Sequence, residues 1–205
     1  MKTNPVLDII ISLLENTVYH FSGRKRIAVF ENVYNGRVYG LGGADYLLGQ
    51  VVRQYYIDES RYYISQKAKS LWDSISRDDI WKYSYRDIVK CQNRDGIEVK
   101  EYVGASSRFT TRILEEGTTF VFNNVFHDEH IVPICAIVKE LQTLSNPNYE
   151  NVSAVLEKLC VCRMLKEEDR SIAARYKRPN SFDEIIDTIY KKSNIELIKR
   201  KAARD

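Results

Sequence analysis

The most reactive side chains of the sequence gather in one short segment, residues 126–133, which reads Phe-His-Asp-Glu-His-Ile-Val-Pro. Two of the three histidines of the chain lie in it, and Glu129 stands directly before His130. A carboxylate is a ligand that hard divalent cations prefer, and a neutral imidazole can take a proton from an attacking water. An ion held there would stabilise the charge that develops on a phosphate ester. The pair can therefore place a metal ion and a general base within one residue of each other.

Three elements are expected around this segment. The apolar run at 119–125 predicts a strand that ends just before it, and the run at 159–162 predicts a second short strand. Residues 166–175 predict a helix whose first turn is rich in acids, including Glu168 and Asp169. Acids in a first turn also complement the helix dipole without any metal, so a structural role is their alternative.

The run Glu-His-Ile-Val-Pro at 129–133 resembles the opening of the HNH, or ββα-metal, nuclease motif, in which an acid–histidine pair precedes two aliphatic residues and a proline. The resemblance extends over residues 119–173, because the family continues with a loop asparagine, a second strand and a helix with a metal-binding residue. It implies a metal-dependent endonuclease that uses Mg²⁺ or Mn²⁺. The implied roles are general base for His130, metal ligands for Glu129 with Asp169 or Glu168, loop bracing for Asn151, and contact to the scissile phosphate for Arg170.

The pattern of elements predicts the α+β class, with hairpins in the first half of the chain and helices in the second. Asn4 and Pro5 predict the start of a first helix. Asn35-Gly36 predicts one hairpin, and Asp95-Gly96 predicts another that joins 83–92 to 97–103.

We expect the chain to divide in three along its length. An N-terminal recognition region of hairpins and helices would span 1–115, and an HNH-like ββα-metal core would span 116–175. A C-terminal helix and basic tail would span 176–205.

Two basic groups indicate where DNA would bind, because lysines and arginines that contact phosphates supply most of the nonspecific affinity for DNA. They are Arg24, Lys25 and Arg26 near the start of the chain, and Lys177 and Arg178 near its end. A solvated surface is the alternative for either group. A small nuclease with a large recognition portion resembles type II restriction enzymes. That likeness implies sequence-specific cleavage of double-stranded DNA by a homodimer.

Other functions remain open at this point. Four side chains could in principle hold zinc, although the Cys-x-Cys spacing is poor for one ion: His127, His130, Cys160 and Cys162. The chain could also be a DNA-binding or protein-interaction module without catalysis, in which the Glu-His segment is structural. An RNase or toxin with the same metal site would differ only in its substrate.

Composition excludes several classes. The 205 residues are 44% hydrophobic and 29% charged, which is typical of a globular chain and not of a disordered one. No apolar run reaches membrane-spanning length, and the first 15 residues are a poor signal peptide, so we expect a cytoplasmic protein without membrane partners. The four cysteines are therefore expected to be reduced thiols.

Overall fold

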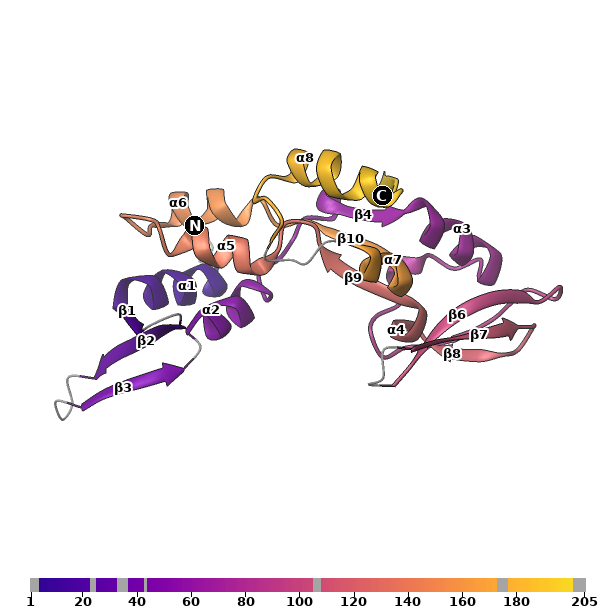
Figure 1. Cartoon of the computed structure of the whole chain (residues 1–205), viewed down its shortest axis with the longest axis horizontal. Helices are drawn as coiled ribbons and strands as arrows, with labels where there is room; N and C mark the ends of the chain where they lie inside the picture. The colour runs from indigo at the N-terminus through magenta and orange to yellow at the C-terminus, as the bar shows by residue number, and fades with distance from the viewer. Residues whose placement is uncertain are drawn as a thin grey trace. The chain divides into compact units, whose positions relative to one another are not determined.

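The computed structural model describes residues 4–22, 25–32, 37–42, 44–104, 108–172 and 177–200, and within 16–46 it describes the backbone alone. The chain forms two compact units. Unit 1 contains residues 1–57, 132–159 and 175–182, and unit 2 contains 58–131, 160–174 and 183–205. The chain alternates between the units, so they do not coincide with the linear division expected at 115 and 175. Small sheets and several helices confirm the α+β class (Figure 1).

Unit 1 combines four helices with one antiparallel sheet. The helices are α1 (Pro5–Asn16), α2 (Ala44–Val52), α5 (Ile134–Leu141) and α6 (Tyr149–Leu156). The sheet has the order β1–β2–β3, with strands Thr17–Ser22, Lys25–Asn32 and Arg37–Gly42. Each helix contacts two of the others, and Ile10 and Ile137 are fully buried among them.

Two expectations for unit 1 are confirmed. The Asn4 side chain accepts a hydrogen bond from the Val6 N–H at 3.1 Å, as expected for the start of α1. Strands β2 and β3 pair antiparallel, as a hairpin around Asn35-Gly36 requires, although these two residues lie outside the described part of the chain.

A four-stranded mixed sheet in the order β11–β4–β10–β9 forms the centre of unit 2. Its strands are β4 (Tyr62–Ser65), β9 (Phe126–His130), β10 (Val161–Leu165) and β11 (Leu197–Lys199). β4 and β10 run parallel, and the two outer strands are antiparallel to them. A helix follows each of the two parallel strands directly: α3 (Gln66–Ile75) after β4 and α7 (Lys166–Ser171) after β10.

Two smaller antiparallel pairs complete unit 2. β5 (Ile88–Lys90) pairs with β8 (Thr119–Val121), and β6 (Ile97–Val103) pairs with β7 (Arg108–Leu114). The expected hairpin around Asp95-Gly96 is therefore wrong. Gly96 does adopt a positive φ of 72°, so a turn is present, but the strands on its two sides pair with later segments.

The segment before the candidate site also differs from its expectation. Residues 119–125 were expected to form one strand, but β8 ends at Val121 and the short helix α4 (Phe122–Val125) follows. β9 then carries the His-Asp-Glu-His sequence itself, so these side chains lie within a strand and not beyond its end.

Before β11 the chain forms a helix in which the hydrogen-bonding pattern changes along its length. α8 (Phe182–Ile185) continues as a π-helical turn (Ile186–Tyr190) and a 3₁₀ turn (Lys191–Ser193). Two further 3₁₀ turns, η1 (Glu59–Arg61) and η2 (Ile80–Lys82), flank β4 and α3. In the described part of the chain no helix is both long and apolar enough to cross a membrane.

An aromatic cluster with a buried arginine stabilises the β9–β10 pair. Trp72 of α3 packs edge-on against Phe122 and Phe126 at centroid distances of 6.0 and 5.7 Å. Arg163 of β10 is 4% exposed and binds both carboxylate oxygens of Asp128, its cross-strand partner, at 2.7 and 2.8 Å. This bidentate pair lies on the same face of β9 as Phe126, because residues two apart on a strand share a face.

Candidate metal centre

The opposite face of β9 presents His127 and Glu129, which are also two residues apart. Their cross-strand partners on β10 are Met164 and Cys162, and both of these are fully buried. Glu129 is only 2% exposed, whereas 26% of the His127 side chain is exposed. One edge of the imidazole thus remains open to solvent beside a buried carboxylate.

Helix α7 brings a second acid, Asp169, to this face. The helix is held at its start by Glu168, whose Oε2 accepts hydrogen bonds from the Leu165 N–H at 2.9 Å and from the Ser65 hydroxyl at 2.6 Å. Ser65 itself caps α3 by accepting from the Ala68 N–H at 3.1 Å. One buried carboxylate therefore ties the starts of α3 and α7 together at the ends of the two parallel strands.

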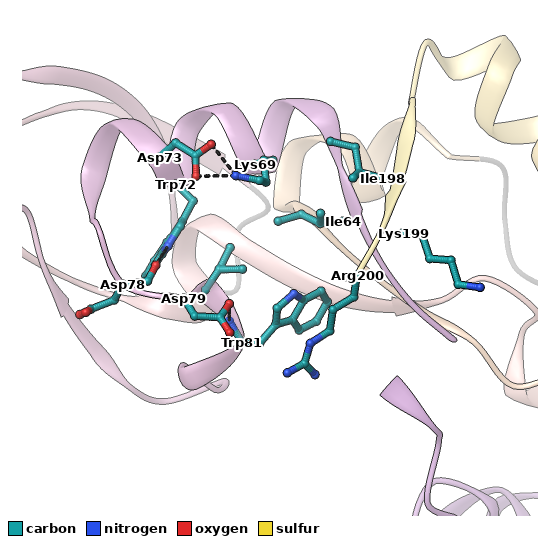
Figure 2. Close-up of a pocket in the computed structure, with 11 residues that line it drawn as sticks. Ile64, Lys69, Trp72, Asp73, Asp78, Asp79, Trp81, Ile198, Lys199 and Arg200 are labelled. Atoms are coloured by element: carbon teal, nitrogen blue, oxygen red, sulfur yellow. Dashed lines mark hydrogen bonds and ion pairs between the residues drawn. The ribbon is translucent and has the colours of Figure 1, made fainter. Parts of the chain in front are cut away.

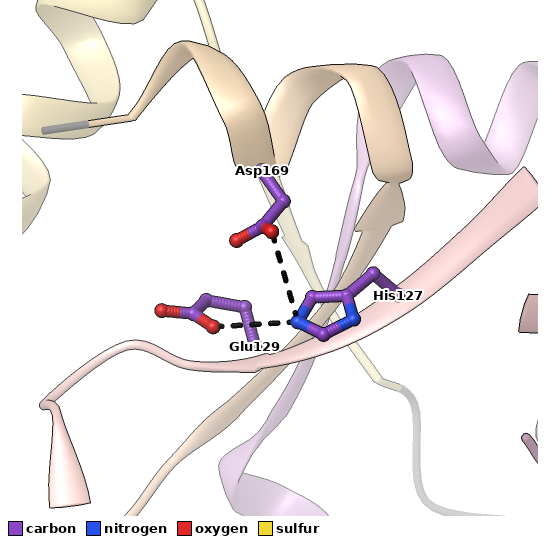
Figure 3. A group of neighbouring side chains, drawn as sticks. All are labelled: His127, Glu129 and Asp169. Carbon is purple, nitrogen blue, oxygen red and sulfur yellow. Dashed lines mark ion pairs between the residues drawn. The ribbon is translucent and has the colours of Figure 1, made fainter. Parts of the chain in front are cut away.

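The two elements meet in a group of three possible ligands, which Figure 3 shows. His127 Nε2 lies 3.5 Å from Oε2 of Glu129 and 3.8 Å from Oδ2 of Asp169. One ligand atom from each residue lies within 4.8 Å of the other two. Nε2 is buried and has no hydrogen-bond partner among the described residues, although it faces both carboxylates.

These distances suit a single ion. Adjacent ligand atoms about 2.1 Å from a cation at tetrahedral or octahedral angles are about 3.0–3.4 Å apart. The two measured separations are slightly longer, so a small movement of the side chains would close the set. One imidazole and two carboxylates suit Mn²⁺ or Zn²⁺ better than a pure oxygen site would, and Mg²⁺ is also bound by such carboxylates.

The structure brings Glu129 and Asp169 together but leaves His130 out of the group. His130 follows Glu129 by one position on β9, so its side chain points to the opposite face, on which Asp128 and Phe126 lie. His127, which the interpretation of the sequence as a nuclease did not use, is the histidine that lies beside the two acids. The i, i+2 spacing of His127 and Glu129 would have revealed this if the segment had been recognised as a strand.

The other residues expected at the site lie in different surroundings. Glu168 is not in the group, because its carboxylate holds the start of α7. Asn151 lies in unit 1, where its N–H donates to the Asn148 side chain at 2.9 Å and its side-chain amide donates to the Asn146 carbonyl at 2.9 Å. Arg170 follows Asp169 on α7 and is exposed.

The expected DNA-contacting residues have mixed positions. Arg24 lies outside the described residues, and Lys25 and Arg26 belong to β2, where only the backbone is described. Lys177 is exposed, but Arg178 is only 9% exposed. A buried arginine is a poor first contact for a DNA backbone, so the structure does not favour that role for Arg178.

The cysteines are poorly suited to the zinc alternative. Cys160 and Cys162 are both buried free thiols, and among the described residues the candidate ligand group contains neither. Burial raises the pKa of Cys162 well above its ordinary value, and the nearby carboxylates Glu168, Asp128 and Glu129 raise it further. A thiol that holds its proton so firmly is a poor zinc ligand.

A hollow elsewhere in unit 2 is lined by acids, but among the described residues these acids do not form a group of possible metal ligands (Figure 2). Its volume is about 330 Å³, and α3, η2 and β11 contribute to its walls. Asp73 accepts from Lys69 at 2.6 and 2.7 Å, and Asp78 accepts from the Tyr83 hydroxyl at 2.8 Å. Asp79 caps η2 by accepting from a backbone N–H. Because these acids already form hydrogen bonds that stabilise the local structure, the hollow is a weaker candidate for a catalytic site.

Comparison of the chain with protein-family models, with curated proteins and with solved structures found no match.

Proposed function

We propose that this chain is a divalent-metal-dependent endonuclease whose ion is held by His127, Glu129 and Asp169. One observation carries the proposal: an imidazole nitrogen without a hydrogen-bond partner faces two carboxylates from different elements. A buried polar atom without a hydrogen-bond partner is costly, and a bound ion would supply a partner for Nε2. An ion would also relieve the repulsion between the two acids.

The order of the elements supports an HNH-like arrangement. β9 and β10 are antiparallel, and α7 follows β10 directly, so strand, strand and helix succeed one another within unit 2. The two strands are separated in sequence by α5 and α6, which belong to unit 1. The core would thus be a ββα unit with a long insertion, as the resemblance of residues 129–133 to the HNH motif implies.

Each residue of the group has a distinct role in this proposal. A bound ion would supply Lewis-acid stabilisation of phosphate charge and would lower the pKa of a bound water. Glu129 is fixed by burial and supplies charge, whereas Asp169 is 22% exposed and faces the approaching substrate. His127 Nε2 points at the same space as the two carboxylates, at 3.5 and 3.8 Å, so His127 serves as the third ligand in this proposal. Arg170, one residue beyond Asp169, stabilises the scissile phosphate.

The proposal is tested by measuring whether phosphodiester cleavage requires both a divalent ion and the ligands His127 and Glu129. Plasmid DNA is incubated with the protein and Mn²⁺ or Mg²⁺, with and without chelator. Nicking should require the ion and should be lost in Glu129→Gln and His127→Ala, whereas Glu167→Gln, a change on the same helix, should retain it. No nicking with any divalent ion on several DNA sequences would overturn the proposal, and cleavage of RNA alone would change only the substrate.

We further propose that the substrate is duplex DNA and that the protein acts as a homodimer. Restriction-type enzymes read palindromic sites as symmetric dimers, so double-strand breaks at defined positions and a dimeric mass on size exclusion are expected. Random nicking by a monomeric protein would be consistent with a nuclease, but it would overturn the assignment to the restriction type.

A further inference from the structure

Glu168 has one carboxylate oxygen that the described part of the fold does not use. Its Oε2 accepts hydrogen bonds from the Leu165 N–H at 2.9 Å and from the Ser65 hydroxyl at 2.6 Å. Its Oε1 is buried and has no hydrogen-bond partner among the described residues, and the whole residue is only 4% exposed. Both oxygens of a carboxylate can accept hydrogen bonds, and a buried acceptor without a donor is costly. One oxygen therefore ties two elements together, and the other is left to accept from a group outside the protein.

The sheet places this carboxylate over the face that carries the candidate ligands. Ser65 and Tyr63 are two residues apart on β4, and Tyr63 is the cross-strand partner of Cys162, so these three side chains share a face. Cys162 is also the cross-strand partner of Glu129, which puts Glu129 on the same face. The hydrogen bond from the Ser65 hydroxyl thus holds the Glu168 carboxylate over that face.

Two further observations place Glu168 near the ligands. It directly precedes Asp169 on α7, and Asp169 Oδ2 lies 3.8 Å from His127 Nε2. Burial raises the pKa of Cys162, and among the nearby carboxylates Glu168 raises it most, so Glu168 lies close to the cross-strand partner of Glu129. Glu168 nevertheless does not belong to the group of three ligands, whose atoms lie within 4.8 Å of one another.

Three protein ligands do not fill the shell of a divalent ion. Zn²⁺ binds about four ligands and Mg²⁺ about six, so an ion held by His127, Glu129 and Asp169 would keep at least one water. Such a water lies about 2.1 Å from the ion and about 2.7 Å from an acceptor, which puts the acceptor roughly 4 Å from the ion. A residue in that position is close to the ligands without being one of them, as Glu168 is.

We propose that Glu168 is a positioning residue whose Oε1 accepts a hydrogen bond from a water in the shell of the ion. The proposal rests on the metal centre of the proposed nuclease, and it gives one carboxylate two tasks. Oε2 holds the start of α7, and Oε1 fixes the direction of the water that attacks the phosphodiester. Groups just outside the ligands orient the shell of an ion, and their loss typically lowers metal affinity or activity by about 10-fold to 100-fold.

Glu168→Gln tests this role with little change in shape. The amide oxygen can still accept from the Leu165 N–H and the Ser65 hydroxyl, and the NH₂ group then replaces Oε1 with a donor. We expect the Mn²⁺ affinity, measured by isothermal titration, to fall about tenfold. We also expect kcat for DNA cleavage at saturating Mn²⁺ to fall about tenfold with an unchanged KM for DNA, while urea unfolding without metal shows that the fold is retained.

Glu167→Gln is the matched control, because it removes the same charge one position earlier on α7 and should match the wild type in each measurement. Relaxation of water protons by bound Mn²⁺ counts the waters on the ion, and this count should be the same in Glu168→Gln and in the wild type. One additional water in Glu168→Gln would make Glu168 a direct ligand and would overturn the proposal. Wild-type Mn²⁺ affinity and kcat in Glu168→Gln would also overturn it.

The affinity measurement separates this proposal from the nuclease. If the wild type binds Mn²⁺ but cleaves no DNA, an affinity about tenfold lower in Glu168→Gln with an unchanged water count would support the water contact, and only the nuclease would fail. Absence of Mn²⁺ binding by the wild type would overturn both.

Discussion

Glu129 is the residue on which the candidate centre depends most. A carboxylate that is 2% exposed is strongly disfavoured as an anion unless cationic groups or hydrogen bonds compensate for the loss of water. His127 and Asp169 lie within reach of an ion that would also bind Glu129. The Asp169 side chain, by contrast, is 22% exposed, so the two acids should differ in what their removal does to stability.

Replacing Glu129 with glutamine should weaken Mn²⁺ binding by at least about tenfold, because a neutral amide is a poorer ligand than a carboxylate. Isothermal titration of the purified protein with Mn²⁺ measures the affinity. Asp169→Asn should behave similarly, and Glu167→Gln should bind as the wild type does. Equal Mn²⁺ affinity in all four proteins would mean that the ion, if it binds, binds elsewhere.

The thiols offer a second test at the residue scale. Because the pKa of Cys162 is raised by burial and by nearby carboxylates, its thiol should stay protonated and unreactive at pH 8 in the native protein. Exposed Cys135 should be alkylated by iodoacetamide first, as mass spectrometry of digested samples would show. Alkylation of Cys162 as fast as Cys135 at pH 8 would contradict the assignment.

The raised pKa of Cys162 also means that the unfolded chain loses this proton at a lower pH than the native protein does. The free energy of unfolding should therefore fall as the pH rises above the ordinary thiol pKa.

The sequence predicted Glu129 and Asp169 as metal ligands with His130 as general base, and the structure brings the two acids together beside His127. The choice of partner acids came from the family resemblance, which carries information about distant contacts. The choice of histidine depended on local geometry, because a residue directly after Glu129 in a strand faces away from it. Polar residues dominate β9, so hydrophobic alternation could not reveal that strand.

Helix α7 is the element that brings Asp169 to the candidate centre, and it is too short to be stable alone. A helix of six residues needs contacts from outside its own turns. The hydrogen bonds of Glu168 to the Leu165 N–H and the Ser65 hydroxyl provide such contacts at its start. The acids in its first turn were ambiguous in sequence. In the structure Glu168 holds the start of the helix, whereas Asp169 lies beside His127.

A double-mutant cycle on Ser65 and Glu168 should show that α3 and α7 are coupled. Each single alanine substitution should destabilise by about 1–3 kcal/mol, since each leaves a buried polar group without its partner. The coupling energy should be about 0.5–3 kcal/mol because the two side chains are in direct contact. Urea unfolding followed by fluorescence measures all four proteins.

Glu167→Ala is the control for that cycle. Its ion pair with Lys100 is largely exposed, so its loss should cost less than about 1 kcal/mol. Additive effects of Ser65→Ala and Glu168→Ala would show that the 2.6 Å hydrogen bond does not couple the helices.

Short sequence signals, such as a capping residue or a turn dipeptide, predicted helices and strands correctly where the residues that interact are close in the sequence. Asn4 marked the start of α1, and Asn35-Gly36 marked the pairing of β2 with β3. Asp95-Gly96 carried the same type of signal and failed, because the strand after it pairs with β7 and β5 pairs with β8. A turn dipeptide fixes the local backbone, but the choice of strand partner depends on burial across the whole unit.

At the scale of the whole molecule, the interleaving of the two units could not be read from the sequence. The chain crosses between them without glycine- or proline-rich linkers, so no change in composition marks the boundaries. All three candidate ligands nevertheless belong to unit 2, as do Trp72 and Trp81, the only tryptophans of the chain. Tryptophan fluorescence therefore reports the stability of the unit that contains the candidate centre.

Mn²⁺ should stabilise unit 2 selectively. An ion that binds only the native state at about 100 times its Kd adds about 2.7 kcal/mol to the free energy of unfolding. For a chain of this size, that corresponds to a rise of roughly 5–10 °C in the midpoint followed by tryptophan fluorescence. His127→Ala and Glu129→Gln should lose the shift, and Tyr85→Leu, a change at an exposed position of unit 2, should keep it.

Circular dichroism at 222 nm also reports the helices of unit 1, so it should show a smaller shift or a second, unshifted transition. An equal shift in the wild type and in His127→Ala would place the ion outside the group. No shift in any protein would leave His127, Glu129 and Asp169 as a structural group that binds no ion.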